Sequence, residues 1–302
     1  MNAQHKTALI LTFIVSLVLV LGGCSGTQGP IQTKDFPLAD VKSVEVDYDG
    51  ESVVIKRSDS DKITIVEYMD KSKKSYLAKM NLASGVLTIT EGARPIGNGV
   101  HSYIEIYLPE SYQNSLSLHT TDGRISSDLV LTISSFHADT TNGTIEISNL
   151  SADQMRITST GGDVSLKNLI THTCTIDTTN ADTHMDYITG IVTYESKGGN
   201  LTATDFSGSG NFRATGDGDM DIAFTQVSGD LTAYAKNGKL VLTLPQNLNF
   251  TFSATTKDGN INTPFSELLS FSGKTAGGTI GDHADIKIGL ETKNGDIEVN
   301  VR

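Results

Sequence analysis

The sequence contains no tryptophan, only two cysteines and six prolines, and aromatic residues make up just 6% of its 302 positions. Two cysteines cannot supply the several bridges of a disulfide-stabilised scaffold. Basic residues are also few, with 23 Lys and Arg against 35 Asp and Glu, so the net charge is −12. A protein that binds a phosphate backbone needs clustered positive charge. The composition therefore argues against a disulfide-rich scaffold and against a nucleic-acid partner.

Glycine, by contrast, is abundant, with 29 residues in a chain that is 37% hydrophobic and 19% charged. This content is too apolar for a disordered chain. The Leu-, Ala- and Glu-rich stretches with a 3.6-residue period that indicate a helical bundle are missing. A chain of 302 residues can hold two average domains or one elongated domain that grows by repetition.

The N-terminus has the pattern of an export signal. Lys6 precedes an apolar run at residues 8–21, which is shorter than the roughly 20 residues needed to span a bilayer and fits a signal peptide. The run ends in the sequence LGGC, whose last residue is Cys24, and this resembles the lipobox of bacterial lipoproteins. The resemblance implies cleavage before Cys24 and its acylation, which anchors the chain at roughly 0.8 kcal/mol per buried methylene.

An uncleaved membrane helix with an incidental cysteine is the alternative, but it would be short, and the polar sequence SGTQGP follows it like a tether. We therefore expect residues 1–23 to be a signal peptide and residues 24–40 to be the lipidated cysteine and a flexible tether. The other cysteine, Cys174, falls at an apolar position of the repeat described below. We interpret it as a small buried hydrophobe rather than a reactive thiol.

Two β-rich regions follow the tether. Residues 41–112 alternate apolar and polar side chains, as at Val44, Val46 and Tyr48, and are broken by turn residues, which predicts a β-rich cap. From residue 113 to 302 a turn signature recurs at intervals of about 18 to 21 residues, apart from the last interval, which is nearly doubled, and this predicts stacked repeats. Its glycines are Gly123, Gly143, Gly162, Gly199, Gly218, Gly238, Gly259 and Gly295. We assign them a structural role at corners where the backbone would need a positive φ.

Apolar residues recur seven and five positions before each turn and two and four positions after it, as at Phe136, Ala138, Ile145 and Ile147. Period-2 alternation places them on one face. Phe212 and its unit are out by one residue, which we interpret as a β-bulge. Antiparallel hairpins assembled into a sandwich are one possible architecture. We favour a parallel β-solenoid, because only stacked coils require like residues at like positions.

Repeated T-x-x-G-x-I/V/L units, such as those around Gly143 and Gly295, follow a strand that ends at Pro109. This order resembles the DUF4097 family of bacterial envelope proteins, described as candidate adhesins, over roughly residues 41–302. The resemblance implies a β-helical fold and a surface location, and it supplies no catalytic residues. Ala181 and residues 264–285 depart from the repeat, which leaves the C-terminal register open.

Three acids around one turn, Asp217, Asp219 and Asp221, invite a calcium interpretation, since calcium takes several hard oxygen ligands. Neither EF-hand spacing nor a repeated nonapeptide supports it, so we expect solvated turn acids. His119 and His137 fall on the outer face of adjacent predicted coils, and no zinc-binding spacing includes them, His172 or His184. No metal or cofactor is expected.

Parallel β-helices also host polysaccharide-active enzymes, and an acidic stripe is available here. Its members are Glu146, Asp163, Asp182, Asp219 and Asp221. A glycosidase needs two carboxyls at a set separation, one with a pKa raised by burial. Nothing in the sequence buries either one, and outward aromatics that would stack on sugars are sparse.

The sequence thus predicts an all-β, single-stranded parallel β-helix, right-handed like the commoner form, with coils of about 19 residues and an N-terminal β-rich cap. We expect a lipid-anchored envelope protein without enzymatic activity, which binds a cell-wall or host-surface ligand as an adhesin or wall-associated module. A regulatory accessory lipoprotein is the alternative, and a polysaccharide-active enzyme is third. The sequence does not indicate an oligomeric state.

Overall fold

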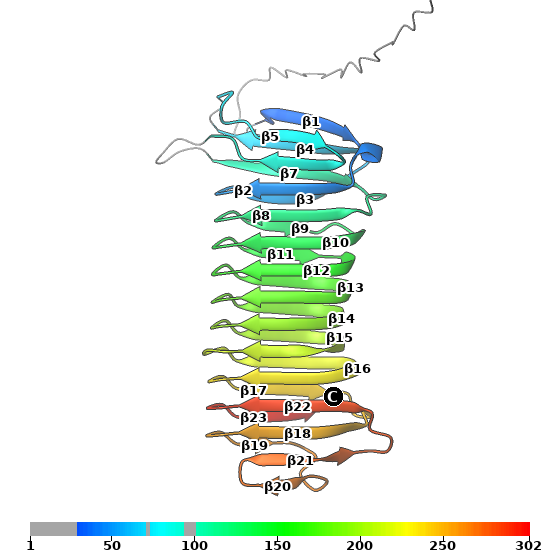
Figure 1. Ribbon diagram of the computed structural model, residues 1–302, viewed down its shortest axis with the longest axis vertical. Coiled ribbons are helices and arrows are strands. Elements are labelled where there is room, and N and C mark those ends of the chain that lie inside the picture. The colour runs from blue at the N-terminus through cyan, green and yellow to red at the C-terminus, as the bar shows by residue number, and fades with distance from the viewer. Residues whose placement is uncertain (1–28, 71–72, 94–100) are drawn as a thin grey trace, which may run out of the picture.

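The computed structural model describes residues 29–70, 73–93 and 101–302. Their strands stack into a single upright rod (Figure 1), which confirms the predicted all-β, solenoid-like fold. The predicted signal peptide and Cys24 lie outside the described residues. Within the described part of the chain, no helix is long and apolar enough to cross a membrane.

The middle of the rod is a stack of coils in which every strand pairs in parallel with the coils above and below. Its strands are β8 (Ser115–Thr120), β9 (Ile125–Ser127), β10 (Leu131–Thr140), β11 (Ile145–Ser148), β12 (Leu150–Ser159), β13 (Val164–Thr178), β14 (Thr183–Ser196), β15 (Leu201–Ala214), β16 (Met220–Ala235) and β17 (Leu240–Leu244). Ile145, for example, pairs in parallel with Ile125 on one side and Val164 on the other. The chain therefore winds, and the alternative sandwich of antiparallel hairpins is excluded.

Like residues stack inside this rod. Leu118, Ala138 and Ile157 are successive Cα partners and are fully buried. Each large apolar side chain in such a column stabilises the fold by roughly 1.5–3 kcal/mol. Phe212 continues the column opposite Tyr194 without a shift in register. The register of its strand shifts before this point, between Ala203 and Gly210, but these shifts are not what puts the Phe212 unit out by one residue. The extra residue lies instead in the following turn, at residues 215–217.

The N-terminal end is closed by antiparallel strands. It contains β1 (Gln32–Pro37), a 3-10 helix (Leu38–Asp40), β2 (Ser43–Tyr48), β3 (Ser52–Ser58), β4 (Lys62–Met69), β5 (Lys79–Ala83), β6 (Val86–Thr90) and β7 (Ser102–Pro109). Strand β1 pairs with β4, and Phe36 packs against the core. Part of the predicted tether is therefore folded, because its alternating side chains give β1 a face to bury.

The chain order at this end differs from the stacking order. Strands β2 and β3 form a coil that pairs in parallel with β6 and β7 on one side and with β8 and β9 on the other. Parallel stacking thus begins at Ser43, inside the region predicted as a separate cap.

The C-terminal end has the same property. Its strands are β18 (Phe250–Thr256), β19 (Ile261–Asn262), β20 (Ser270–Ser272), β21 (Thr275–Ile280), β22 (Ile286–Thr292) and β23 (Ile297–Val301). The last coil, β22 and β23, is inserted between β16/β17 and β18/β19 (Figure 1). The antiparallel strands β20 and β21 close the rod, which explains why residues 264–285 depart from the repeat.

Candidate binding surfaces

The repeated glycines lie directly over one another along one edge of the rod. We call this edge the glycine column. In stacking order it contains Glu51, Gly123, Gly143, Gly162, Ala181, Gly199, Gly218, Gly238, Gly295 and Gly259. A Cβ on Gly143 would lie 1.9 Å from the carbonyl oxygen of Gly123, and one on Gly162 would lie 1.8 Å from that of Gly143. A side chain at these glycines would collide with a neighbouring backbone, because each turn rests directly on the next.

The expected positive φ is absent from these glycines, so that part of the prediction is wrong. Positive φ occurs at the opposite corner, at Asn149, Asn168, Tyr187 and Asp205, with values between 49° and 60°. Asn is among the residues that tolerate this conformation, because its short side chain bonds locally. Here the Asn168 amide donates to the Asn149 side-chain oxygen at 2.9 Å.

Buried hydroxyls close several turns of the glycine column from inside. The Thr120 hydroxyl donates to the Gly123 carbonyl at 2.6 Å, and the Thr140 hydroxyl accepts from the Gly143 N–H at 2.9 Å. In the turn where Ala181 replaces the glycine, the buried Thr178 hydroxyl has no hydrogen-bond partner among the described residues. The serines and threonines of the repeat therefore have a structural role.

Three acids of the predicted stripe also hold neighbouring coils together. Asp163 accepts a hydrogen bond from the Asp182 N–H at 3.2 Å, and Asp182 accepts one from the Asn200 N–H at 2.8 Å. Asp219 accepts from the Lys239 N–H at 2.7 Å. Each carboxylate thus binds the backbone of the next coil and is occupied.

The structure keeps the other two acids of the stripe apart. Glu146 and Asp221 share an outward column, but their partners Ser165, His184 and Thr202 lie between them. Four steps of about 4.8 Å separate them by about 19 Å. Paired glycosidase carboxyls are only about 5–9.5 Å apart. Glu146 and Asp221 therefore do not form a two-carboxylate hydrolytic site with one another.

The candidate metal ligands do not converge either. Asp217 accepts a hydrogen bond from the Asn237 side-chain amide at 2.6 Å, which joins the turns of two neighbouring coils. His119 Nδ1 lies 2.7 Å from Asp139 Oδ2, while His172 is exposed on a separate coil. Over the ranges that the structure describes, no group of three or more His, Cys, Asp or Glu side chains is arranged to hold a metal ion.

Burial shifts the pKa of two further side chains. Cys174 is buried, as predicted, and desolvation raises the pKa of its thiol to about 12. Desolvation also lowers the pKa of His137, opposed by Asp139 and assisted by Arg156 and His119. The Cys174 thiol is therefore inert, and the charged form of His137 is destabilised.

The cap also carries an outward-facing tyrosine cluster that the sequence pattern does not predict. Tyr68 on β4 and Tyr103 on β7 are Cα partners, and their rings stack with centroids 4.5 Å apart at 8°. Beside them Glu105, only 5% exposed, accepts from the Tyr107 hydroxyl at 2.7 Å and forms an ion pair with Lys56. The alternation of Tyr103, Glu105 and Tyr107 signals a shared face, but their contact with Tyr68 depends on antiparallel pairing.

The electrostatics of this cluster fix its carboxylate in the charged form. Burial alone would raise the pKa of Glu105, but hydrogen bonds from Lys56 and Tyr107 hold it below its ordinary value. The hydrogen bond to Glu105, together with burial, raises the pKa of Tyr107. The stacked rings add roughly 0.5–1.5 kcal/mol beyond their buried area, so the cluster stabilises the cap.

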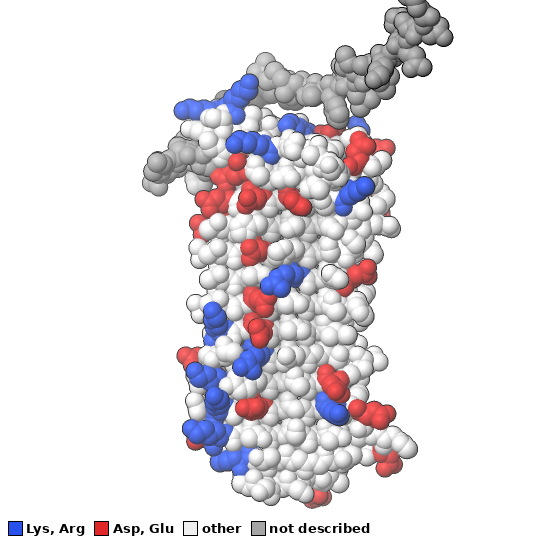
Figure 2. Space-filling view, viewed as in Figure 1, with Lys and Arg blue, Asp and Glu red and all other residues white. Residues whose placement is uncertain are grey.

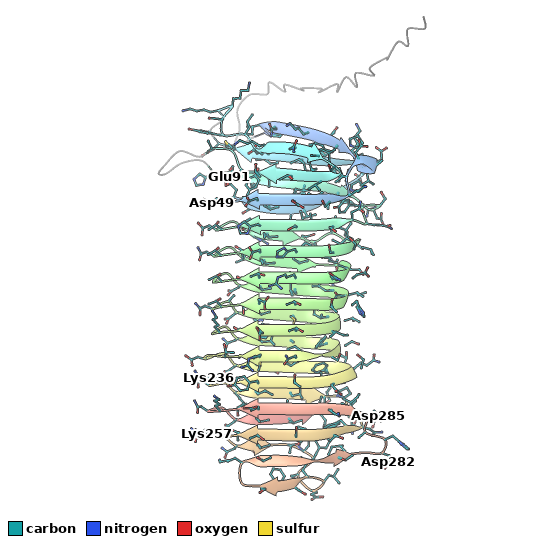
Figure 3. The ribbon with its side chains drawn as sticks, in the orientation of Figure 1. Asp49, Glu91, Lys236, Lys257, Asp282 and Asp285 are labelled. Carbon is teal, nitrogen blue, oxygen red and sulfur yellow. The ribbon has the colours of Figure 1, made fainter. Side chains whose placement is uncertain are left out.

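Charge is distributed unevenly along the glycine column. At the cap end Asp49 and Glu91 face the same edge, where the Asp49 N–H donates to the Glu91 carboxylate at 2.7 Å (Figure 3). These acids line a shallow open hollow. Towards the far end Lys236 and Lys257 occupy the edge instead (Figure 3), and basic side chains gather along it in the lower half of the rod (Figure 2). The edge is thus acidic near the N-terminus and basic away from it.

This chain was compared with known proteins, with solved structures and with protein-family models. No curated protein matches. A crystal structure of a candidate adhesin from Bacteroides fragilis is 16% identical over 91% of this chain and 100% of its own, with a TM-score of 0.44. One from Parabacteroides merdae is 12% identical over 90% and 96%, with a TM-score of 0.44. A candidate cell adhesion protein from Clostridium sporogenes is 11% identical over 90% and 98%, with a TM-score of 0.32.

The family assignment stands on the sequence match, which covers the whole stack of coils from the second strand to the last. Residues 41–300 match the model of one family, so the chain belongs to the Toastrack DUF4097 family.

Proposed function

We propose that this protein is an exported, lipid-anchored binding module of the cell envelope that acts as an adhesin or wall-associated protein without enzymatic activity. The observation that carries the proposal is the rod itself, whose edge changes from acidic to basic with distance from the N-terminus. From Glu51 to Gly259 the glycine column takes nine steps, which at about 4.8 Å each amount to about 43 Å. A lipid at Cys24 would place the cap near the membrane and carry the far end away from it.

The roles of the outer acids support a binding function over catalysis. Asp163, Asp182 and Asp219 accept backbone hydrogen bonds, and Glu146 forms an ion pair with Arg124. Carboxylates held in this way are engaged by the protein itself and are not free to act on a substrate as a general acid or base.

The proposal is tested by fractionation and by binding to isolated cell walls. The full chain should partition into detergent with membranes, and Cys24→Ala should leave it in the aqueous phase. The full chain in neutral detergent should also be retained by sedimented bacterial walls. Aqueous partitioning of the wild-type chain would contradict the anchor, and failure to sediment with walls or with host cells would contradict the binding role.

A further inference from the structure

Four exposed lysines stand along the far half of the glycine column, and we call them the lysine column. They are Lys197, Lys236, Lys293 and Lys257. Each immediately follows a strand and opens the turn. In the half nearer the cap, the same position is occupied by uncharged residues, namely Thr121, Thr141, Thr160 and Thr179.

Backbone hydrogen bonds fix the order of these lysines. The Asn294 N–H donates to the Lys236 carbonyl at 3.0 Å, and the Asp258 N–H donates to the Lys293 carbonyl at 2.8 Å. Lys236, Lys293 and Lys257 therefore occupy three consecutive levels, although Lys293 comes last in the sequence. The insertion of β22 and β23 completes this run of positive charge.

Lys197 extends the column by two levels. Its carbonyl oxygen lies against Gly216, and the Asn237 N–H donates to the Gly216 carbonyl at 3.2 Å. The five levels from Lys197 to Lys257 thus span four steps, or about 19 Å. Neighbouring charges lie within a Debye length of about 8 Å or close to it, so they act together on a ligand.

The column is unfavourable for the isolated protein. Like charges on neighbouring coils repel, whereas Lys239, also in the far half of the rod, is paired with Glu298. Lys257 has Asp258 at 3.5 Å. For Lys197, Lys236 and Lys293 no ion pair with an acid occurs in the described part of the chain, despite a net charge of −12. An external anion would relieve this repulsion.

We propose that the lysine column binds a linear polyanion, a chain of repeated phosphate groups that lies along the rod axis. The inference rests on the proposed function and names the chemistry of its partner. A single file of cations fits an extended polymer. The column lies along the side of the rod, away from the N-terminus, while the acidic edge at Asp49 and Glu91 faces the end where an anionic bilayer would be.

Titration of labelled sodium polyphosphate into the full chain in neutral detergent, followed by fluorescence anisotropy, tests the inference. Lys236→Gln with Lys293→Gln should weaken binding about tenfold or more, and Lys236→Arg with Lys293→Arg should retain it. The matched control is Lys74→Gln with Lys79→Gln on the cap, which removes the same charge from exposed positions and should change binding less than about twofold. Raising the salt concentration should weaken wild-type binding.

Equal losses in the two Gln pairs would overturn the lysine column as the site, and so would the absence of polyphosphate binding. Column-dependent binding to phosphatidylglycerol vesicles without binding to polyphosphate would also overturn it, in favour of a lipid surface. Sedimentation with cell walls separates the two levels of the proposal. If the Lys236→Gln, Lys293→Gln chain still sediments fully, the envelope role stands and the polyanion inference fails.

Discussion

At the scale of single residues, close contact between backbones determines which side chains the repeat accepts. The glycine at each turn is fixed by the carbonyl of the neighbouring turn rather than by its own φ. At Ala181, where a methyl group stands in this column, the neighbouring Thr178 hydroxyl has no hydrogen-bond partner among the described residues. The most constrained residues are therefore small ones with no chemistry of their own.

Gly162→Ala and Gly161→Ala form a matched pair that tests this account. A Cβ on Gly162 would meet the Gly143 carbonyl oxygen at 1.8 Å, whereas one on Gly161 would have its nearest neighbour at an ordinary 3.6 Å. We expect Gly162→Ala to lower the free energy of unfolding by about 1–3 kcal/mol and Gly161→Ala to change it by less than about 0.5 kcal/mol. Denaturant unfolding measures both, and equal effects would refute the contact explanation.

His137 makes stability depend on pH. Because burial lowers its pKa in the folded state, the unfolded chain binds a proton more readily below the ordinary value of about 6.5. The free energy of unfolding should therefore fall as the pH drops from 7 through this range, and it should fall less in His137→Gln. Thermal unfolding of both chains between about pH 7 and pH 5.5 measures the difference. Parallel pH dependences would contradict the assignment.

At the scale of strands, each end of the rod contains a coil that is inserted between two coils which follow one another in the chain. Strand β22 pairs with β16 on one side and β18 on the other, although it lies near the C-terminus. Terminal elements usually fray first, because few contacts hold them. Here the chain end is an interior coil, and the antiparallel strands β20 and β21 form the exposed end.

Hydrogen exchange tests this arrangement. Amides of β22 and β23 should exchange as slowly as those of β16 and β17, because they have ladder partners on both sides. They should exchange more slowly than those of β20, which pairs only with β21. The experiment uses the intact chain and peptide-level mass spectrometry. Exchange in β22 as fast as in β20 would show that the terminal coil is not inserted.

The sequence predicts the winding of the chain but not its order at the ends. Recurrent apolar positions require stacked coils, and the buried columns follow them. The same regularity does not reveal that the last coil is inserted, because every coil offers similar partners. Leu290, for example, pairs with both Ala233 and Ala254. The tyrosine cluster is hidden for a related reason, because the pairing of Tyr68 with Tyr103 crosses strands that no period connects.

At the scale of the whole molecule, stacking turns a repeat in sequence into columns in space, and the columns carry the surface properties. The fold places acids near the N-terminus and lysines away from it along one edge (Figures 2 and 3). The last coil contributes Lys293 between two lysines that precede it in sequence. The proposed partner surface therefore depends on the stacking order of the coils.

The stacking order of the coils can be measured along one column of outward-facing side chains. In stacking order it contains Ser126, Glu146, Ser165, His184, Thr202, Asp221, Val241, Glu298 and Asn262. The seven steps from Ser126 to Glu298 correspond to about 34 Å and the eight to Asn262 to about 38 Å. In Cys24→Ser chains, buried Cys174 stays unlabelled while cysteines introduced at these positions take spin labels.

Pulsed electron paramagnetic resonance between a label at Ser126 and one at Glu298 or Asn262 tests the account directly. We predict two long distances, with Asn262 the farther by about 5 Å even though it precedes Glu298 in the sequence. A shorter distance to Asn262 would contradict the inserted coil. Two short distances would contradict the winding of the chain into a rod.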